Sequence, residues 1–275
     1  MINSLQIIIV LYKAHLEDSD SYRTLMQNVN RLHVRWNLMI YNNSADILIP
    51  QGDYKLIVPE ENRMLAGAYN EALKEAAANG CDWLLLLDQD TRITENYIEA
   101  LNHFFSLETK VCAAFPVLEN KNLYLSPHAY SPFWGPWFST RKLNYGMVKN
   151  KYVSAFNSAT VFSVSDIESI GGFPEDFPLD MLDTCVCYRL SRSGKSFFVL
   201  NCVLQHDLSV QDYEHNMNKT RYLSLIQAEN RLALQMGITV YMSLKMRLLL
   251  RFVKQLFVPS KRAYSIDTLK YLFSK

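Results

Sequence analysis

Two carboxylates stand one residue apart directly after an apolar run in the first third of the chain. Residues 83–87 read Trp-Leu-Leu-Leu-Leu, and Asp88, Gln89 and Asp90 follow. Five consecutive large apolar residues predict a strand buried on both faces, whose carboxyl end carries the acids. Open α/β sheets bind ligands at that end, and hard oxygen ligands suit Mg²⁺ or Mn²⁺. Taken alone, the same residues also fit an ordinary polar turn.

The elements around this run predict a mostly parallel sheet. Apolar runs at residues 5–12, 36–41, 55–58 and 83–87 alternate with helical patterns at 19–32 and 65–79, which is typical of βαβ units. Gly80 is expected to end one helix in a left-handed conformation, and Thr94 to cap the next. A further strand is expected at 111–117.

The middle of the chain has a different character. Seven Tyr, Phe and Trp side chains are interleaved with Pro and Gly between residues 124 and 145, which predicts an ordered loop that lines a pocket. Strand-like residues 151–163 follow, and then a capping box at Ser165 and Glu168 opens a short helix. A helical stretch to Arg192 and a strand at 196–204 complete this part.

The C-terminal portion, from about residue 220, is predicted to be helical and basic. Its apolar residues recur at steps of three and four, while cations share another face. Such a helix lies in the interface of an anionic membrane or packs on the domain with its cations in water. The apolar stripe is Tyr241, Leu244, Leu248, Phe252 and Leu256, and the cations are Arg247, Arg251 and Lys254, with Lys261 and Arg262 beyond.

Composition limits the classes of protein. The 275 residues are 49% hydrophobic, enough for a large core in one or two domains. Lys plus Arg is 28 against 27 for Asp plus Glu, so no overall field attracts nucleic acid. Five cysteines, no apparent signal peptide and no apolar run of about 18 residues predict reduced thiols in a cytoplasmic protein that does not span a membrane. Cys185 and Cys187 fit core packing better than zinc binding.

These motifs resemble the family-2 glycosyltransferases of GT-A fold, and within them the bacterial rhamnosyltransferase-like branch, over roughly the first 230 residues. The resemblance implies an α/β fold with a Rossmann-like, mostly parallel central sheet flanked by helices and a helical C-terminal extension. It divides the chain into a catalytic domain at 1–219, with a nucleotide-binding half at 1–117 and an acceptor-binding half at 118–219, and an extension at 220–275.

In that family the donor nucleotide binds over the first strands. The first strand ends here at Tyr12, in a turn that would lie under the nucleotide. The second ends at Asn42, where the family commonly has an acid that touches the base or ribose. Residues 62–70 resemble an Asn-x-Gly element whose Asn62 and Asn70 would line the nucleotide site, with Met64 where Gly is common.

The Asp-Gln-Asp run matches the family's metal motif. By this resemblance Asp90 binds Mg²⁺ or Mn²⁺, Asp88 contacts the ribose or a metal-bound water, and Gln89 adds to the donor site. His206 resembles the histidine that completes the metal shell in many GT-A enzymes. The metal would neutralise charge that develops on the departing nucleoside diphosphate.

Residues 179–189, Leu-Asp-Met-Leu-Asp-Thr-Cys-Val-Cys-Tyr-Arg, resemble the rhamnosyltransferase-like Ile-Asp-Tyr-Val-Asp-Thr-Glu-Trp-Cys-Leu-Arg. Inverting transfer needs a carboxylate that takes a proton from the acceptor hydroxyl. Asp183 stands at the position of the family's base, and Asp180 is the alternative. Both aspartates also suit the start of a helix, where the macrodipole favours acids. Cys185 stands where the family has a further acid.

Three weaker matches complete the resemblance. Residues 157–159, Asn-Ser-Ala, are similar to an Asn-Ser-Gly element near the transferred sugar. Arg221 would hold the diphosphate or a lipid-linked acceptor. Residues 229–231 resemble an Arg-Asn pattern in which Glu229 replaces the arginine.

The implied function is inverting, metal-dependent transfer of a sugar, rhamnose from dTDP-rhamnose, to a polysaccharide or lipid-linked saccharide. The product would belong to a cell-surface glycan such as O-antigen, capsule or cell-wall polysaccharide, made at the inner membrane face. The alternatives are another donor such as a UDP-hexose or UDP-galactofuranose, a degenerate sugar-nucleotide-binding protein, a haloacid-dehalogenase-like phosphatase or a nucleotidyltransferase.

Overall fold

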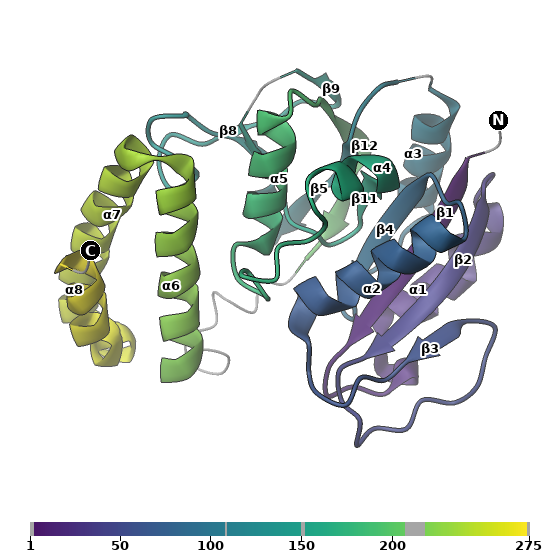
Figure 1. Cartoon of the computed structure of the whole chain (residues 1–275), viewed down its shortest axis with the longest axis horizontal. Coiled ribbons are helices and arrows are strands. Elements are labelled where there is room, and N and C mark those ends of the chain that lie inside the picture. Colours follow the sequence, from purple (N-terminus) through teal and green to yellow (C-terminus); the bar gives the residue numbers. More distant parts are fainter. Residues whose placement is uncertain (1–2, 108, 150–151, 207–217, 274–275) are drawn as a thin grey trace. The chain divides into compact units, whose positions relative to one another are not determined.

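The computed structural model describes residues 3–107, 109–149, 152–206 and 218–273 (Figure 1). The chain divides into two compact units. The first contains Met1–His128 and Lys142–His206, and the second contains Ala129–Arg141 and the C-terminal helices. The second unit thus includes a segment that the sequence placed in the acceptor-binding half, and residues 207–217 of that half lie outside the described residues.

A nine-stranded sheet forms the centre of the first unit. The strand β1 (Ser4–Leu11) lies between β2 (Arg35–Asn42) and β4 (Trp83–Asp88) and is parallel to both, and β3 (Lys55–Ile57) extends this half of the sheet beyond β2. This alternation confirms the predicted βαβ units. The order along the sheet is β3-β2-β1-β4-β11-β5-β12-β9, and β6 pairs with β5.

The other half of the sheet is mixed. Strand β11 (Thr160–Ser163) is antiparallel to β4 and to β5 (Ala113–Asn120), whereas β12 (Phe197–Gln205) is parallel to β5. The edge strand β9 (Gly146–Val148) is antiparallel to β12. Strand β4 therefore lies inside the sheet, with β1 on one side and β11 on the other.

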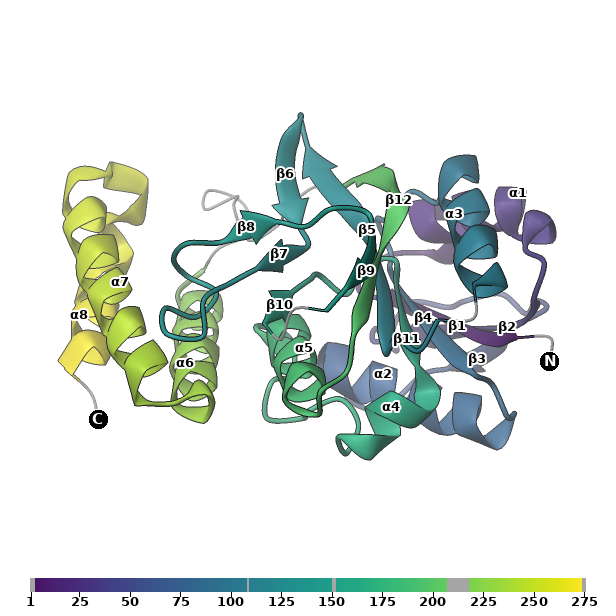
Figure 2. The same cartoon turned by 90° about the horizontal axis from the view of Figure 1, so that it is seen from above.

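Helices cover both faces of this sheet, as Figure 2 shows. Helices α1 (Asp20–Asn28) and α3 (Glu95–Ser106) lie on one face, and α2 (Met64–Ala78) and α4 (Val164–Ser169) lie on the other. Helix α5 (Leu182–Arg192) completes the helices of this unit.

The expected helix ends are mostly confirmed. Gly80 has a left-handed φ of 62°, and the Thr94 side chain accepts a hydrogen bond from the backbone of Tyr97. The capping box predicted at Ser165 is wrong, because Ser163 caps α4 by accepting from the Asp166 backbone. Strand β11 ends at Ser163, so the cap of α4 lies two residues before the predicted Ser165.

The aromatic segment predicted to be a loop contains short strands instead. They are β6 (Leu123–Ser126), β7 (His128–Ala129), β8 (Arg141–Lys142) and β9. Strands β10 (Val153–Ser154), β7 and β8 form a second, three-stranded sheet. The predicted strand at 151–163 is thus divided into β10 and β11, and Lys151 lies outside the described residues.

Three helices, α6 (Lys219–Met236), α7 (Ile238–Phe257) and α8 (Ser265–Phe273), pack side by side in the second unit. Leu244 and Leu248 are buried against Trp137 and Ala233. The packed reading describes the part of the predicted stripe that contains Leu244 and Leu248, whereas Leu256 is exposed. None of the described helices is long and apolar enough to cross a membrane.

Buried polar contacts join these helices. The hydroxyl of Tyr222 lies 2.6 Å from that of Thr268 and accepts from Gln255 at 2.7 Å, which links α6, α7 and α8. Arg251 makes a two-pronged pair with Glu229 at 2.7 and 2.8 Å. Arg251 is therefore a buried partner of Glu229 and does not share the water-facing row of cations that the sequence predicted.

The five cysteines are buried free thiols, as expected from their apolar surroundings. Burial raises the pKa of Cys185 and Cys202 to about 12. These side chains pack in the core and are unreactive at neutral pH.

Candidate active site

The parallel register aligns three strand ends. Val10 pairs with Asp88 of β4, and Leu11 pairs with Asn42 of β2. Tyr12, which follows β1, is therefore brought to the same edge as Asn42 and Asp88. This confirms that the first strands deliver polar side chains to one place, as expected for an α/β sheet.

Asp88 is held by two hydroxyl groups from different elements. Tyr69 of α2 donates to Oδ1 at 3.2 Å, and Ser158 donates to Oδ2. Tyr69 is fully buried and Ser158 is 2% exposed, so both donors are fixed by their surroundings. Each carboxylate oxygen can accept more than one hydrogen bond, so Asp88 keeps capacity for a ligand.

The turn after Asp88 is fastened to the start of α1. The Ser21 hydroxyl lies within hydrogen-bond distance of the carbonyl oxygens of Asp88 and Thr91, and Ser19 donates to that of Gln89 at 2.8 Å. The Gln89 side chain accepts from the Tyr12 backbone at 2.9 Å. Asp90, at the tip of this turn, is exposed. The turn is thus rigidly placed while Asp90 faces solvent.

Asp183 lies in the first turn of α5, half-buried. The backbone and hydroxyl of Thr184 donate to its Oδ1 at 2.6 and 3.3 Å. The N-cap is Met181, in a left-handed conformation with φ 61°, and not Asp180, which is 7% exposed.

The pKa of Asp183 reflects opposed effects. Burial raises the pKa from 3.8 to about 6, and the negative charges of Asp180 and Asp88 add to the rise. The hydrogen bonds that Thr184 donates at this helix start favour the charged form and lower the pKa. For Asp183 the effect of desolvation on the pKa is the largest one. Raised carboxyl pKa values of this size are typical of functional sites.

The aspartates of the two motifs are close enough for their charges to act on shared neighbours. Burial raises the pKa of Tyr69 well above 10, and Asp88, Asp183 and Asp90 each raise it further by their charge. Asp180 in turn raises the pKa of Asp183. The two acidic motifs, 92 residues apart in sequence between Asp88 and Asp180, therefore act on the same region of the first unit.

Helix α2 connects the two motifs. The backbone amides of Leu65 and Ala66 donate to the carbonyl of Pro178 at 3.0 and 3.1 Å. Both amides belong to the first turn of α2, and backbone amides in the first turn of a helix have no hydrogen-bond acceptors within that helix. The loop that leads to Asp180 is thereby held by the helix that also carries Tyr69.

Two of the predicted nucleotide contacts have other partners. The Asn42 side chain is fully buried; its amide donates to Ser44 and Ile47 carbonyls, and its oxygen accepts from the Ser44 backbone. Asn42 therefore shapes its own loop. The oxygen of Asn62 accepts from the Met64 backbone at 2.8 Å, but Asn62 is exposed.

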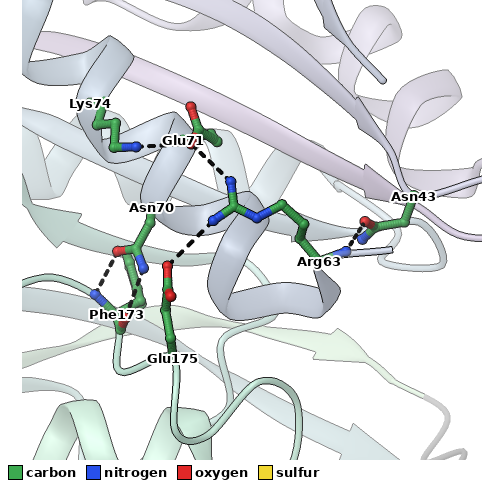
Figure 3. Close-up of polar contacts among 7 residues, drawn as sticks. All are labelled: Asn43, Arg63, Asn70, Glu71, Lys74, Phe173 and Glu175. Carbon is green, nitrogen blue, oxygen red and sulfur yellow. Dashed lines mark hydrogen bonds and ion pairs between the residues drawn. The ribbon is translucent and has the colours of Figure 1, made fainter. Parts of the chain in front are cut away.

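Asn70 clamps a distant turn, as Figure 3 shows. Its oxygen accepts from the Phe173 backbone and its nitrogen donates to the Phe173 carbonyl, both at 2.8 Å. Gly172 has φ 82°, and a Cβ there would approach the Asn70 oxygen to 2.8 Å. Both ends of the Asn70 amide are thus bonded to the Gly-Gly-Phe turn, and the expected contact of Asn70 with the nucleotide stays a prediction.

The residues expected to bind metal are only partly gathered. Among the described residues no group of three or more His, Cys, Asp or Glu side chains could hold a metal ion. His206 is thus not assembled with Asp88 and Asp90, although its Nδ1 is buried without a hydrogen-bond partner in the described structure. Two carboxylates fit Mg²⁺ or Mn²⁺ if substrate phosphates and water supply the remaining ligands.

Arg221 lies on α6, in the second unit, where its backbone amide donates to the Asn218 side chain at 2.9 Å. Its predicted contact with a diphosphate or an acceptor stays a prediction.

Sequence reasoning missed the residues that position the carboxylates. Tyr69, Ser158 and Ser21 hold Asp88 and its turn, and Asn43 accepts from Arg63 and donates to the Met64 carbonyl at the start of α2. The sequence offered one indication that Ser158 belongs to the site, namely its place in the Asn-Ser-Ala element. The others have no local pattern that reveals their partners.

A comparison with known families matches the part of the chain that contains the Asp88–Asp90 turn. Residues 42–167 match the family model described as Glycosyl transferase family 2. The matched segment includes Asp88 and Asp90, whereas Asp183 and His206 lie beyond it. No curated protein matches the sequence.

Solved structures share the fold. GalNAc-T7, solved with UDP, GalNAc and Mn²⁺, is 11% identical with a TM-score of 0.54; the alignment covers 83% of this chain and 48% of that one. S. aureus TarS is 14% identical with a TM-score of 0.53, over 98% of this chain and 54% of that one. This chain spans about half the length of these proteins. The GT-A fold is thereby confirmed, and it is not the fold of a haloacid-dehalogenase-like phosphatase.

Proposed function

We propose that this protein is an inverting glycosyltransferase that uses a divalent metal and a nucleotide-diphosphate sugar. One observation carries the proposal: Asp183 is half-buried, its pKa is about 6, and the charge of Asp88 contributes to that shift. A base with this pKa is ionised at neutral pH yet able to take a proton. Its neighbours are the carboxylates of a turn suited to a metal and diphosphate.

In the proposed step, Asp183 removes the proton from an acceptor hydroxyl. The hydroxyl oxygen forms a bond to the anomeric carbon while the bond from that carbon to the diphosphate oxygen breaks. Because attack and departure occur on opposite faces, the anomeric configuration inverts. Asp183 ends the step protonated and releases the proton to solvent, and the nucleoside diphosphate leaves.

Asp90 and Asp88 would hold Mg²⁺ or Mn²⁺ together with the donor's diphosphate. Bound there, the ion would offset the charge that develops on the leaving group. Tyr69 and Ser158 fix the orientation of Asp88, which is the usual task of groups that bond to a metal-binding carboxylate. His206 would join this set only through a rearrangement.

For the donor we propose dTDP-rhamnose, with a UDP-hexose or UDP-galactofuranose as the alternative. For the acceptor we propose a polysaccharide or lipid-linked saccharide of a cell-surface glycan. The support is the resemblance of residues 179–189 to the rhamnosyltransferase-like branch, in which Asp180, Asp183, Thr184, Cys187 and Arg189 match.

A second candidate is a sugar-nucleotide-binding protein without activity. It is favoured by Asn42, Met64 and Cys185, which stand where the resembled family commonly has an acid, a glycine and a further acid. Retention of Asp88, Asp90 and Asp183 favours the enzyme. Turnover separates the two candidates.

The test is a panel of dTDP-, UDP- and GDP-sugars with Mn²⁺, read by thermal stabilisation and by release of nucleoside diphosphate. A bound donor raises the melting temperature by mass action. We expect stabilisation and slow hydrolysis with at least one donor, both lost in EDTA and in Asp90→Ala. Stabilisation without any turnover would select the binding protein, and full activity in EDTA would refute the metal role.

A further inference from the structure

Helix α7 in the second unit carries apolar side chains on two opposite faces. Its inner face, with Val240, Leu244 and Leu248, is buried in the core of that unit. A second set of apolar side chains points to solvent, with exposed fractions from 41% for Leu256 to 80% for Phe257. This outer face consists of Ile238, Met242, Met246, Leu249, Leu250, Val253, Leu256 and Phe257.

The outer face is a continuous stripe and not a scatter of exposed residues. At about 100° per residue, its eight positions fall within an arc of roughly 120°, opposite the buried face. The stripe runs from Ile238 to Phe257, the whole length of α7. An uninterrupted apolar surface of this kind marks a contact with a partner or a membrane.

The sequence of α7 and the residues after it carries an excess of cations although the whole chain is only +1. Residues 238–275 contain eight Lys and Arg and a single acid, Asp267, and one of the cations, Arg251, is paired with Glu229 of α6. Asp267 is 5% exposed and lies 3.7 Å from Lys219, so it adds no negative charge to the surface. Lys254, Arg262 and Lys270 are exposed.

We propose that the outer face of α7 binds the interface of an anionic phospholipid membrane, with the helix lying in the plane of the surface. Apolar side chains would enter the boundary between headgroups and acyl chains while exposed cations meet lipid phosphates. Ile266 and Phe273 of α8, 66% and 79% exposed, add apolar surface in the same unit.

Charge selects a lipid surface over a second copy of the chain. A two-fold dimer on this face would bring the same patch of cations from each copy together, and like charges repel. An anionic leaflet attracts the same cations. The proposed surface shares Leu256 with the stripe predicted from sequence but otherwise differs from it, because Leu244 and Leu248 of that stripe are buried.

The experiment is flotation of the full chain with vesicles of phosphatidylcholine alone or with about 30% phosphatidylglycerol. The test variant is Met246→Glu with Leu250→Glu. The control is Leu48→Glu, which replaces an 88% exposed leucine of the first unit with the same charged side chain. Circular dichroism melting shows whether the variants are folded, and soluble variants are also compared by binding at several salt concentrations.

We expect the native chain and Leu48→Glu to float with the anionic vesicles, with binding that weakens as salt is raised. The α7 variant should bind at least about tenfold more weakly. A native chain that stays in the soluble fraction, or an α7 variant that binds as well as the native chain, would overturn the proposal. A concentration-dependent dimer that the α7 variant abolishes would assign the face to a second copy instead.

The membrane proposal rests on α7 and its charges and does not require glycosyl transfer. Release of nucleoside diphosphate from a soluble donor should be unchanged in the α7 variant. A chain that releases nucleoside diphosphate but does not bind vesicles would contradict only the membrane proposal. A chain that binds vesicles but shows no turnover would contradict only the proposed glycosyl transfer.

Discussion

The hydroxyl of Tyr69 donates a 3.2 Å hydrogen bond to Oδ1 of Asp88. This contact joins the middle of α2 to the acidic end of β4. The same tyrosine is close enough to Asp90 and Asp183 for their charges to raise its pKa. Tyr69 thus stays neutral at neutral pH, its hydroxyl orients Asp88, and the charges of Asp90 and Asp183 also act on it.

Removing this hydroxyl should weaken metal binding. In Tyr69→Phe, Asp88 keeps its bond from Ser158 but loses its bond from α2, so we expect the Mn²⁺ concentration for half-maximal activity to rise about tenfold. Tyr54→Phe is the control, because it also removes a hydrogen-bonded tyrosine hydroxyl, but one that donates to the Pro50 carbonyl in an exposed loop. An unchanged Mn²⁺ requirement would show that Tyr69 has no positioning role.

Replacing Met64 with glycine should be tolerated although helix starts rarely favour glycine. Met64 has φ 54°, a conformation that costs a residue with a Cβ about 1–2 kcal/mol. Relief of this strain offsets the entropy cost of glycine, so we expect the free energy of unfolding in urea to stay the same or to rise by up to about 1 kcal/mol. Met26→Gly, inside α1 and similarly exposed, should instead destabilise by about 1 kcal/mol. Equal losses in both variants would contradict this account.

Asp183→Asn should stabilise the protein at neutral pH. The folded-state pKa of about 6 lies above the unfolded value of 3.8, so ionisation of Asp183 costs stability as pH rises through this interval. We expect the variant to gain about 3 kcal/mol above pH 6.5 and nothing below pH 3.5, measured by thermal or urea unfolding without metal. A loss of stability at pH 7 would mean that the charged carboxylate stabilises the fold, which contradicts a raised pKa.

The pair of Glu229 with Arg251 should hold the second unit together. Glu229→Gln leaves a buried guanidinium without its countercharge, and we expect a loss of roughly 3–5 kcal/mol in unfolding of the full chain. Replacing both partners, as Glu229→Leu with Arg251→Met, should recover most of this loss. If the double variant is as unstable as the single one, packing and not the unpaired charge is responsible.

The sequence predicted features that depend on local pattern. The strand before Asp88 was visible because five apolar residues precede the acids. Two glycine positions of the family pattern are filled here by Met64 and Ala159, and both have a left-handed backbone, with φ 54° and 56°. The resemblance therefore carried information about backbone conformation even where the residue type had changed.

The partners of polar side chains could not be predicted, because they depend on contacts between distant segments. Asn70 and Phe173 are 103 residues apart, and nothing near Asn70 indicates that its amide clamps a turn. Arg251 was counted with the exposed cations because helical spacing shows which residues share a face but not what packs against it. Glu229, its partner, lies on another helix.

The most direct test of the central claim is the rate of sugar transfer by Asp183→Asn beside that of Asp176→Asn, a neighbouring exposed acid. Donor binding is followed by thermal stabilisation with Mn²⁺ in the same samples. We predict that Asp183→Asn binds the donor but transfers at least about a thousandfold more slowly, while Asp176→Asn transfers normally. The native rate should rise with pH through about 6. Transfer by Asp183→Asn at the native rate would contradict the assignment of Asp183 as the base.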